Sequence, residues 1–520
     1  MGSNELIKPS VMVCAPITTT QQSVSTEQIV NGMHQAKAEG ADMVEIRLQC
    51  VTNFNPLHDL KVILQNKPLP VLIVDWQKWE GDENMRLEAL QLAVELGADF
   101  VEVELKAASC LQTLVEHKRN YNSHGKMIVS CNVDGITPPQ EELLQLVAQM
   151  QATGADIIKL VTHAADITEI IRIFYLFSCC RVPLIAYSVG ERGLISQILS
   201  PKFGGFIVYG SLAGNTIPGL PSLDSLQKAY ELEHVNADTK VFGLISKPVS
   251  HSKGPILHNP SFRHVNYNGI YVPMFVDNLE EFFSTYTSPD ISGFSVGFPY
   301  KEKVLRFCDE VHPLAQSIEA VNTIIRRPKD GKLVGYNTDC EAAITAIEDA
   351  LIEHGYNDGG ASLSSPLAGR LFVLVGAGGA AKALAFGAKS RGARLVIFDI
   401  DFDRAKSLAC AVLGEVQPYE ELVNFQPEKG AILANATPVG MHPNTDRIPV
   451  AEATLGDYLL VFDVVYTPRR TRLLKDADAA GAITVSGVEM FLRQAIGQFN
   501  LFTGLKAPEE FMREIVLSKF

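Results

Sequence analysis

The sequence lacks the features that mark membrane-spanning, disulfide-rich and nucleic-acid-binding proteins. No apolar run reaches 18 residues without a charge, so we expect no membrane span. There is no block of basic residues and the net charge is −14, which argues against nucleic acid or an anionic membrane as a partner. Nine cysteines occur without a CxxC pair or metal-ligand spacing, so we expect a reducing compartment and no metal.

The first residues, MGSNELIKPS, lack the apolar core of a secretory signal and the Arg/Ser-rich character of a transit peptide. We therefore expect a cytoplasmic protein, or a plastid protein if a transit peptide has been removed. At 520 residues the chain is too long for one ordinary domain, and its 47% hydrophobic content is typical of globular proteins. Two or three domains are expected.

The first 210 residues alternate between short apolar strands and helical segments. Eight such alternations over about 200 residues predict a (β/α)8 barrel. In that fold the reactive side chains lie at the carboxyl ends of the strands. The expected strands are VMVCAP (11–16), MVEIRL (43–48), VLIVDW (71–76), FVEVEL (100–105), MIVSCN (127–132), IIKLVT (157–162), LIAYSV (184–189) and FIVYG (206–210).

The second half contains a strand, LFVLVG (371–376), that leads directly into a glycine-rich turn and a helix. A second strand follows and ends in Asp399. This layout predicts a Rossmann domain that binds a dinucleotide at the helix N-terminus. The expected cofactor-binding residues are Gly376, Ala377, Gly378, Gly379, Ala380 and Asp399.

Asp399 bears on the choice of cofactor. A carboxylate at this position can accept hydrogen bonds from the adenosine ribose, whereas a 2′-phosphate would be repelled by Asp399 and Asp401. The sequence therefore favours NAD, with NADP as the alternative, because Arg404 lies close enough to reach a phosphate. Asp399 can also be read as a residue that merely caps a turn.

Several short motifs occur in a fixed order along the second half. They are KPVSHSKGPILHN (247–259), GFSVGFPYKE (293–302), AVNT (320–323), YNTD (336–339), GAGGAAKA (376–383), NATPVGM (435–441), DVVYTP (463–468) and GVEMFLRQA (487–495). With these motifs the chain resembles the plant bifunctional 3-dehydroquinate dehydratase/shikimate dehydrogenase family over about 11–515. The resemblance implies a type I dehydroquinate-dehydratase-like barrel at 11–232, a substrate domain at 240–335 plus 476–520, and a Rossmann NAD(P)-binding domain at 336–475.

The resemblance also implies a catalytic pair. Oxidising a secondary alcohol requires a group that takes the hydroxyl proton while hydride leaves for the nicotinamide. Lys301 follows a proline at a strand end, and Asp339 in YNTD is its expected partner. The remaining residues that the resemblance implies are Ser250, Ser252, Gly254, Gly297, Asn322, Tyr466 and Gln494 for the substrate, and Thr437, Gly487 and Met490 for the cofactor.

Two glycines depart from the family pattern. The family usually has a serine at the position of Gly254 and a threonine at the position of Gly297, and both hydroxyls hold the substrate carboxylate. Losing both side chains would make room for the extra hydroxyl that quinate carries beside its carboxylate, so the pocket is predicted to prefer quinate over shikimate. The subtype expected from this reasoning is a quinate dehydrogenase.

The barrel also departs from the family, whose dehydratases form a Schiff base through a lysine and move protons with a histidine. Lys159 matches the lysine, but Asn132 stands at the histidine position and does not titrate near neutrality. Glu45, Arg47, Glu80 and Lys159 remain, whereas Trp76, Gln197 and Leu220 replace an arginine, an arginine and a glutamine. We expect a degenerate barrel with little dehydratase activity.

The sequence thus favours an NAD-dependent quinate dehydrogenase that oxidises quinate reversibly to 3-dehydroquinate, with shikimate as a weaker substrate. The alternative is a bifunctional dehydroquinate dehydratase and NADP-dependent shikimate dehydrogenase. A non-catalytic scaffold is disfavoured in the second half by Lys301, Asp339 and the intact nucleotide motif. A monomer is expected, with small molecules as its partners.

Overall fold

A computed structural model describes residues 11–17, 23–74, 83–215, 217, 219–249, 252–356 and 365–519. Contacts divide the chain into two units. The first comprises Met1–Lys240, Pro248–Asn259 and Asn268–Asp290, and the second comprises Val241–Lys247, Pro260–Tyr267 and Ile291–Phe520. Over these described ranges, none of the helices has the length and apolar character needed to cross a membrane.

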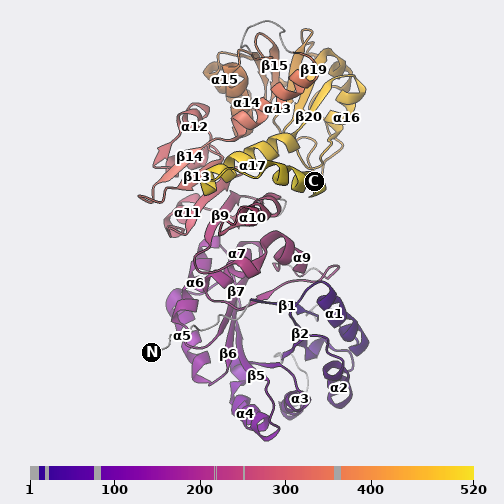
Figure 1. The fold of residues 1–520 in the computed structure, drawn as a ribbon, viewed down its shortest axis with the longest axis vertical. Helices are drawn as coiled ribbons and strands as arrows, with labels where there is room; N and C mark the ends of the chain where they lie inside the picture. The colour runs from indigo at the N-terminus through magenta and orange to yellow at the C-terminus, as the bar shows by residue number, and fades with distance from the viewer. Residues whose placement is uncertain are drawn as a thin grey trace. The chain divides into compact units, whose positions relative to one another are not determined.

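Eight parallel strands form the centre of the first unit, with helices around them (Figure 1), which confirms the predicted (β/α)8 barrel. Hydrogen-bonded neighbours follow the order β7-β6-β5-β4-β3-β2-β1-β8. The strands are β1 (Met12–Pro16), β2 (Met43–Arg47), β3 (Val71–Val74), β4 (Phe100–Glu104), β5 (Lys126–Asn132), β6 (Ile157–His163), β7 (Leu184–Val189) and β8 (Ile207–Tyr209). The helices are α1 (Thr26–Ala38), α2 (Pro56–Gln65), α3 (Glu83–Glu95), α4 (Leu111–Asn120), α5 (Gln140–Ala152), α6 (Ile170–Cys179), α7 (Leu194–Ile198), α8 (Ser200–Phe203) and α9 (Leu223–Ser225).

Local sequence signals set where the barrel helices begin. Helix α1 follows Ser25, whose side chain accepts a hydrogen bond from the backbone N–H of Gln28, and the Gln28 side chain accepts one from Ser25 N in return. Helix α2 begins with Pro56 after the capping residue Asn55. Both arrangements satisfy backbone donors that the first helical turn leaves without partners.

The first unit extends beyond the barrel and includes β10 (Gly269–Phe275) and α11 (Leu279–Thr285). Arg192, which follows β7, forms an ion pair with Asp277 through Nε at 2.5 Å and Nη2 at 3.1 Å. Tyr286 donates its hydroxyl to the carbonyl of Ile167 at 2.7 Å. These contacts join the barrel to segments that the sequence assigns to the substrate domain, and the predicted domain boundaries stay a prediction.

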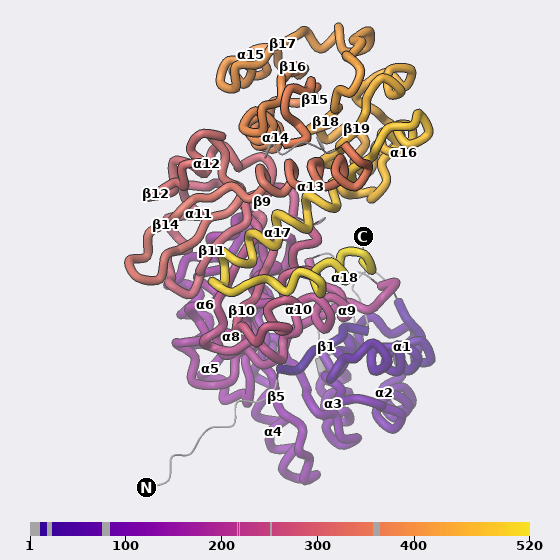
Figure 2. The backbone as a smooth tube through the Cα atoms, turned by 45° about the horizontal axis from the view of Figure 1, so that its top comes forward, coloured from indigo at the N-terminus to yellow at the C-terminus, as the bar shows by residue number. Residues whose placement is uncertain are grey.

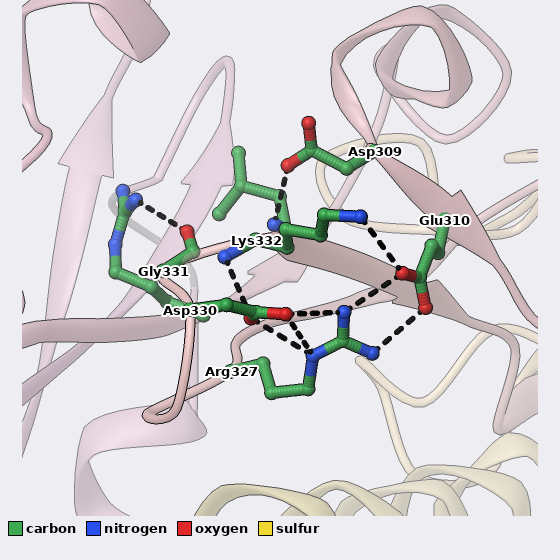
Figure 3. Close-up of polar contacts among 8 residues, drawn as sticks. Asp309, Glu310, Arg327, Asp330, Gly331 and Lys332 are labelled. Carbon is green, nitrogen blue, oxygen red and sulfur yellow. Dashed lines mark hydrogen bonds and ion pairs between the residues drawn. The ribbon is translucent and has the colours of Figure 1, made fainter.

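The first sheet of the second unit carries the strands in the order β9-β11-β13-β14-β12. They are β9 (Lys240–Ser246), β11 (Ile291–Val296), β13 (Thr323–Arg326), β14 (Leu333–Tyr336) and β12 (Glu310–Val311), with α12 (Pro313–Ile318) between β12 and β13 in the chain. Figure 3 shows the ion pairs at its edge, where Arg327 contacts Glu310 at 2.7 Å and Asp330 at 2.7 Å. This network holds the turn between β13 and β14 against β12.

The second sheet is parallel throughout and has the order β17-β16-β15-β18-β19-β20. Phe372 and Leu374 of β15 belong to one hydrophobic core, and Val373 and Val375 belong to another on the opposite face, as expected for a strand covered on both sides. The strands are β15 (Leu371–Val375), β16 (Arg394–Phe398), β17 (Glu415–Val416), β18 (Ala431–Asn435), β19 (Tyr458–Asp463) and β20 (Ile483–Ser486). The helices are α13 (Asp339–Glu353), α14 (Gly379–Ser390), α15 (Phe402–Ala411), α16 (Arg472–Ala479), α17 (Gly487–Thr503) and α18 (Glu509–Lys519).

Helix α13 packs against both α14 and α17, and α17 runs beside it in Figures 1 and 2. The contact between α13 and α14 is close because α14 has a glycine there. A methyl group added at Gly387 of α14 would lie 2.4 Å from Cγ1 of Ile344 and 3.1 Å from Sγ of Cys340, both on α13. The two helices can therefore approach only because this position has no side chain.

The substitution Gly387→Val is expected to destabilise the second unit by about 1–3 kcal/mol, because the core cannot take the added volume without moving a helix. Ser390→Val is the matched control, since Ser390 lies on the same helix and is exposed. Denaturant unfolding of both variants measures the difference, and equal stabilities would contradict this account of the packing.

Candidate active sites

The barrel interior contains a buried lysine held by two carboxylates. Lys159 on β6 is 3% exposed, and its Nζ donates to Oε2 of Glu45 at 2.8 Å and to Oε2 of Glu102 at 2.9 Å. Arg47 donates from Nε to the other oxygen of Glu45 at 2.9 Å. The sequence predicts three of these four residues. It misses Glu102, although an acid within the apolar strand 100–104 is a signal for an inward-facing charge.

These neighbours fix the charge of each group. Burial alone would favour the neutral amine, but the carboxylates of Glu102 and Glu45 outweigh it and raise the pKa of Lys159 above its usual range. Burial likewise disfavours a charged Glu45, yet Lys159 and Arg47 lower its pKa to about 2. Lys159, Arg47 and Glu45 are therefore charged near neutral pH, and a proton must leave Lys159 before its nitrogen can act as a nucleophile.

Aromatic rings close the site on one side. The Tyr209 ring centre lies 4.7 Å from Nζ of Lys159, and the rings of Tyr187 and Tyr209 are 5.3 Å apart. Gln197 accepts a hydrogen bond from the backbone N–H of Tyr209 at 3.1 Å, so this side chain supports β8. Asn132 ends β5 and is partly buried. Glu80 and Trp76 lie outside the described residues.

In the second unit, the predicted pair Lys301 and Asp339 is in contact. Nζ of Lys301 donates to Oδ2 of Asp339 at 2.5 Å, with the lysine side chain 23% exposed and the aspartate side chain 5% exposed. Asp339 is the first residue of α13, and Asn337 accepts hydrogen bonds from the backbone N–H groups of Asp339 and Cys340 at 3.0 and 3.1 Å. The aspartate is thus held rigidly, while the lysine end remains accessible.

Asn322 positions the same region. Its Oδ1 accepts from the backbone N–H of Thr338 at 2.8 Å, and its Nδ2 donates to the Thr338 hydroxyl at 2.9 Å. Gln498, which the sequence reasoning missed, donates from Nε2 to the Asn322 carbonyl at 3.2 Å and accepts from the Ser295 hydroxyl at 2.7 Å. Asn322 therefore fixes the start of α13, and its predicted contact with substrate stays a prediction.

The glycine-rich turn lies directly beside the lysine. Gly376 has φ +115°, a conformation that L side chains rarely adopt. A methyl group added at Gly379 would lie 3.1 Å from Cβ and 3.3 Å from Cδ of Lys301, whereas one added at Gly378 would meet no atom within 4 Å. The turn therefore leaves open space at Gly378, at the N-terminus of α14, where a pyrophosphate would bind. These residues fit a nicotinamide dinucleotide, as the sequence predicts.

In the acidic turn after β16, the side chain of Asp399 has a hydrogen-bond partner within the turn itself. Oδ1 of Asp399 accepts from the backbone N–H of Asp401 at 2.8 Å, which is the turn-capping role that the sequence left open. Asp401 in turn accepts from the backbone N–H of Arg404 at 3.1 Å and caps α15. Ala377 and Ala380 lie in the glycine-rich turn and at the start of α14.

The loops after β18 and β19 are tied together by a buried carboxylate. Oδ1 of Asp463 accepts from Nδ2 of Asn435 at 2.9 Å and from Val465 N at 3.0 Å, and Oδ2 accepts from the Thr471 hydroxyl at 2.6 Å. Burial raises the pKa of Asp463 to about 6, against these three hydrogen bonds, which lower it. Thr437 donates to the Asn435 side chain at 2.7 Å and so belongs to the same assembly.

The remaining predicted residues have structural contacts of their own. A methyl group at Gly487 would lie 2.4 Å from the Val464 carbonyl, so this glycine lets α17 begin against the end of β19. Met490 is 6% exposed within the hydrophobic core, and Gln494 donates to the Phe491 carbonyl at 3.0 Å. The ring of Tyr466 lies 5.0 Å from that of Phe491.

The two glycines from which quinate was predicted do not leave open space. A methyl group at Gly254 would lie 2.5 Å from Cε1 of Tyr271, and one at Gly297 would lie 2.7 Å from Oγ of Ser246. Side chains of the chain itself therefore occupy the room that was assigned to the extra hydroxyl. Ser252 accepts from the backbone N–H of Gly254 at 3.2 Å, and Ser250 lies outside the described residues.

Comparison with known proteins shows the family of this chain. Models of type I 3-dehydroquinase, of the shikimate dehydrogenase substrate-binding domain and of the shikimate 5′-dehydrogenase C-terminal domain match residues 13–237, 244–324 and 487–517. The bifunctional 3-dehydroquinate dehydratase/shikimate dehydrogenase of Arabidopsis thaliana, a chloroplastic protein, is 48% identical over all of this chain and 86% of its own length. The chain belongs to this family.

Two further proteins match only about half of this chain. Shikimate dehydrogenase (NADP(+)) of Methanopyrus kandleri is 38% identical over 54% of this chain and 97% of its own length. A crystal structure of shikimate dehydrogenase in complex with NADP+ is 32% identical, covers 55% of this chain and 96% of its own, and has a TM-score of 0.48.

The quinate dehydrogenase prediction is wrong. The full-length similarity to a bifunctional enzyme and the dehydratase model matched by the barrel overturn both the quinate preference and the expectation of little dehydratase activity. Tyr271 and Ser246 supply the physical reason for the first error. For the barrel, the error lay in weighing the missing histidine above the retained charged array of Lys159, Glu45 and Arg47.

Gly378→Ala is expected to separate cofactor binding from stability. The backbone at Gly378 has φ −82°, which alanine adopts readily, so the loss of stability should stay below about 1 kcal/mol. The methyl group would occupy the space for the pyrophosphate, and the dissociation constant for the reduced cofactor should rise at least about tenfold. Fluorescence titration measures this, and unchanged binding would place the phosphates elsewhere.

Asp463→Asn is expected to change how stability depends on pH. Because the folded-state pKa is raised from 3.8 to about 6, the folded state binds more protons than the unfolded state in this interval. Wild-type stability should therefore fall as pH rises from about 4 to about 6, by at most about 3 kcal/mol at 1.36 kcal/mol per pKa unit.

Asparagine cannot ionise, yet its oxygen can keep the bonds from Asn435 and Val465 while its amide donates to the Thr471 hydroxyl. The variant should gain stability relative to wild type between pH 4.5 and pH 7.5, measured as denaturant midpoints. A constant difference across this range would show that Asp463 does not titrate there.

Proposed function

We propose that the chain is a bifunctional enzyme. Its barrel removes water from 3-dehydroquinate to give 3-dehydroshikimate, and its second unit reduces that ketone to shikimate with NADPH. The similarity to the Arabidopsis enzyme over the whole chain supports both activities, and the archaeal NADP-dependent relative supports the second. The chloroplastic relative also supports a plastid location for this protein.

The contact between Lys301 and Asp339 beside the glycine-rich turn is the observation that carries the proposal. Hydride delivered to the ketone carbon leaves a negative charge on its oxygen, and a lysine ammonium can give that oxygen a proton. Asp339 aims the Lys301 side chain, since the pair is joined at 2.5 Å. The stem of Lys301 lies against Gly379, so the lysine is held beside the turn at which the pyrophosphate of the cofactor would bind. The cofactor, when bound, supplies the hydride.

The barrel chemistry rests on Lys159. A neutral amine can add to the ketone of 3-dehydroquinate, and the carboxylate of Glu102 lies 2.9 Å from Nζ to take the proton that the amine must first lose. Asn132 has no titratable proton and Lys159 and Arg47 lower the pKa of Glu45 to about 2, so Glu102 is the group we assign to proton transfer with Lys159. Arg47 keeps Glu45 oriented through its bond to the second oxygen.

We propose NADP as the physiological cofactor. The preference for NAD over NADP that was inferred from Asp399 is weakened, because one oxygen of this carboxylate already accepts a hydrogen bond from the backbone of Asp401. Arg404 lies in the first turn of α15, directly after the acidic turn, and offers a cation for a 2′-phosphate. The monomeric state stays a prediction.

Two lysine substitutions are expected to separate the activities. Lys301→Met should lower the rate of shikimate oxidation with NADP⁺ by about 10²–10⁴-fold and leave dehydration of 3-dehydroquinate intact. Lys159→Arg should do the reverse, because arginine keeps a positive charge between Glu45 and Glu102 but cannot form an imine. Absorbance of the reduced cofactor and of the conjugated dehydration product measures the two reactions.

Lys159→Met serves as the control for burial. This substitution removes both the amine that forms the imine and the positive charge. It should therefore also destabilise the barrel by about 3–5 kcal/mol, because two carboxylates are left without their cation. A wild-type protein without dehydratase activity, or a Lys159→Arg variant that keeps it, would contradict the assignment of Lys159.

A further inference from the structure

Glu302, the residue after Lys301, joins the lysine-bearing segment to the nucleotide-binding sheet through two cations. Its Oε1 accepts a hydrogen bond from Nη2 of Arg404 at 2.8 Å, and its Oε2 lies 3.4 Å from Nζ of Lys382. Arg404 is on α15, just after β16, and Lys382 is in the first turn of α14. The carboxylate therefore contacts the first turn of both α14 and α15.

Arg404 is placed where a dinucleotide distinguishes NAD from NADP. In this layout the adenosine ribose lies at the end of the second strand, which here is β16, and an arginine nearby can take a 2′-phosphate. The guanidinium suits a phosphate because its N–H groups form a fixed fork. In the structure this fork already holds an anion, the carboxylate of Glu302.

We propose that Glu302 determines cofactor specificity by competing with the 2′-phosphate for Arg404. This inference rests on the proposed NADP-dependent function. A cofactor with a 2′-phosphate must break the bond between Glu302 and Arg404 before it gains the guanidinium, whereas NAD leaves that bond in place. Glu302 thus lowers the advantage that Arg404 gives to NADP.

The surroundings of Glu302 allow the exchange. A cavity of about 440 Å³ lies beside it, lined by Glu302, Leu305, Arg306, Gln316, Glu319 and Lys382. The displaced carboxylate can therefore turn away from Arg404 and keep its contact with Lys382. The ion pair is also readily broken, since Arg404 is 50% and Glu302 37% exposed. Exposed pairs of this kind change an equilibrium by about two- to fivefold.

The test compares two probes that differ only in the 2′-phosphate, adenosine 2′,5′-bisphosphate and adenosine 5′-monophosphate, by calorimetric titration of the full chain. Glu302→Gln is expected to tighten the bisphosphate about two- to fivefold and to leave the monophosphate unchanged. Arg404→Gln should weaken the bisphosphate selectively. In the double variant the effect of Glu302→Gln should disappear, because the competition no longer exists.

Glu319→Gln is the matched control. Glu319 lies 3.3 Å from Lys382 and pairs with that lysine, whereas Arg404 pairs with Glu302, so removing the charge of Glu319 changes the local field without releasing the guanidinium. It should leave the ratio of the two affinities unchanged. An equal effect of Glu302→Gln on both probes, or an effect that persists in the Arg404→Gln background, would overturn the proposal.

The same titrations separate this inference from the proposed function. A wild-type protein that binds the monophosphate more tightly than the bisphosphate would count against NADP dependence, while the change caused by Glu302→Gln still tests the competition. A wild-type preference for the bisphosphate that Glu302→Gln does not increase would refute the role of Glu302 alone.

Discussion

The close approach of Lys301 to the start of α14 is the constraint on which the second unit depends. A methyl group at Gly379 would lie 3.1 Å from Cβ of Lys301, so the absence of a side chain at this turn lets the lysine stem pack against it. The pair with Asp339 then aims Nζ, and Asp339 is held by Asn337 at the beginning of α13. A side chain at Gly379 would press on the stem of Lys301, the proposed proton donor, beside the turn at which the cofactor phosphates would bind.

The two lysines that we propose as reactive groups differ in burial and in the number of carboxylates around them. Lys159 is enclosed, with two carboxylates and an aromatic ring around its nitrogen, so its charge is compensated entirely by the protein. Lys301 has one carboxylate and remains partly open to solvent and ligand. The open end of Lys301 suits the proposed role as a proton donor, whereas the carboxylates that raise the pKa of Lys159 make the loss of its proton the costly step of the proposed imine chemistry.

The sequence predicts the architecture well because strand alternation and glycine turns are local signals. The barrel, the Rossmann sheet and the contact between Lys301 and Asp339 follow from motifs read one segment at a time. What fills a missing side chain is not local: Tyr271 lies 17 positions after Gly254, and Ser246 lies 51 before Gly297. The quinate prediction failed for that reason, and Glu102 and Glu302 went unnoticed because their partners are distant in the chain.

The most direct test supplies the purified protein with 3-dehydroquinate and NADPH and identifies the product. If the barrel dehydrates the substrate and the second unit reduces the resulting ketone, shikimate accumulates as NADPH is consumed. If the barrel is inactive and the second unit reduces 3-dehydroquinate itself, quinate accumulates instead. Quinate as the main product would contradict the bifunctional assignment.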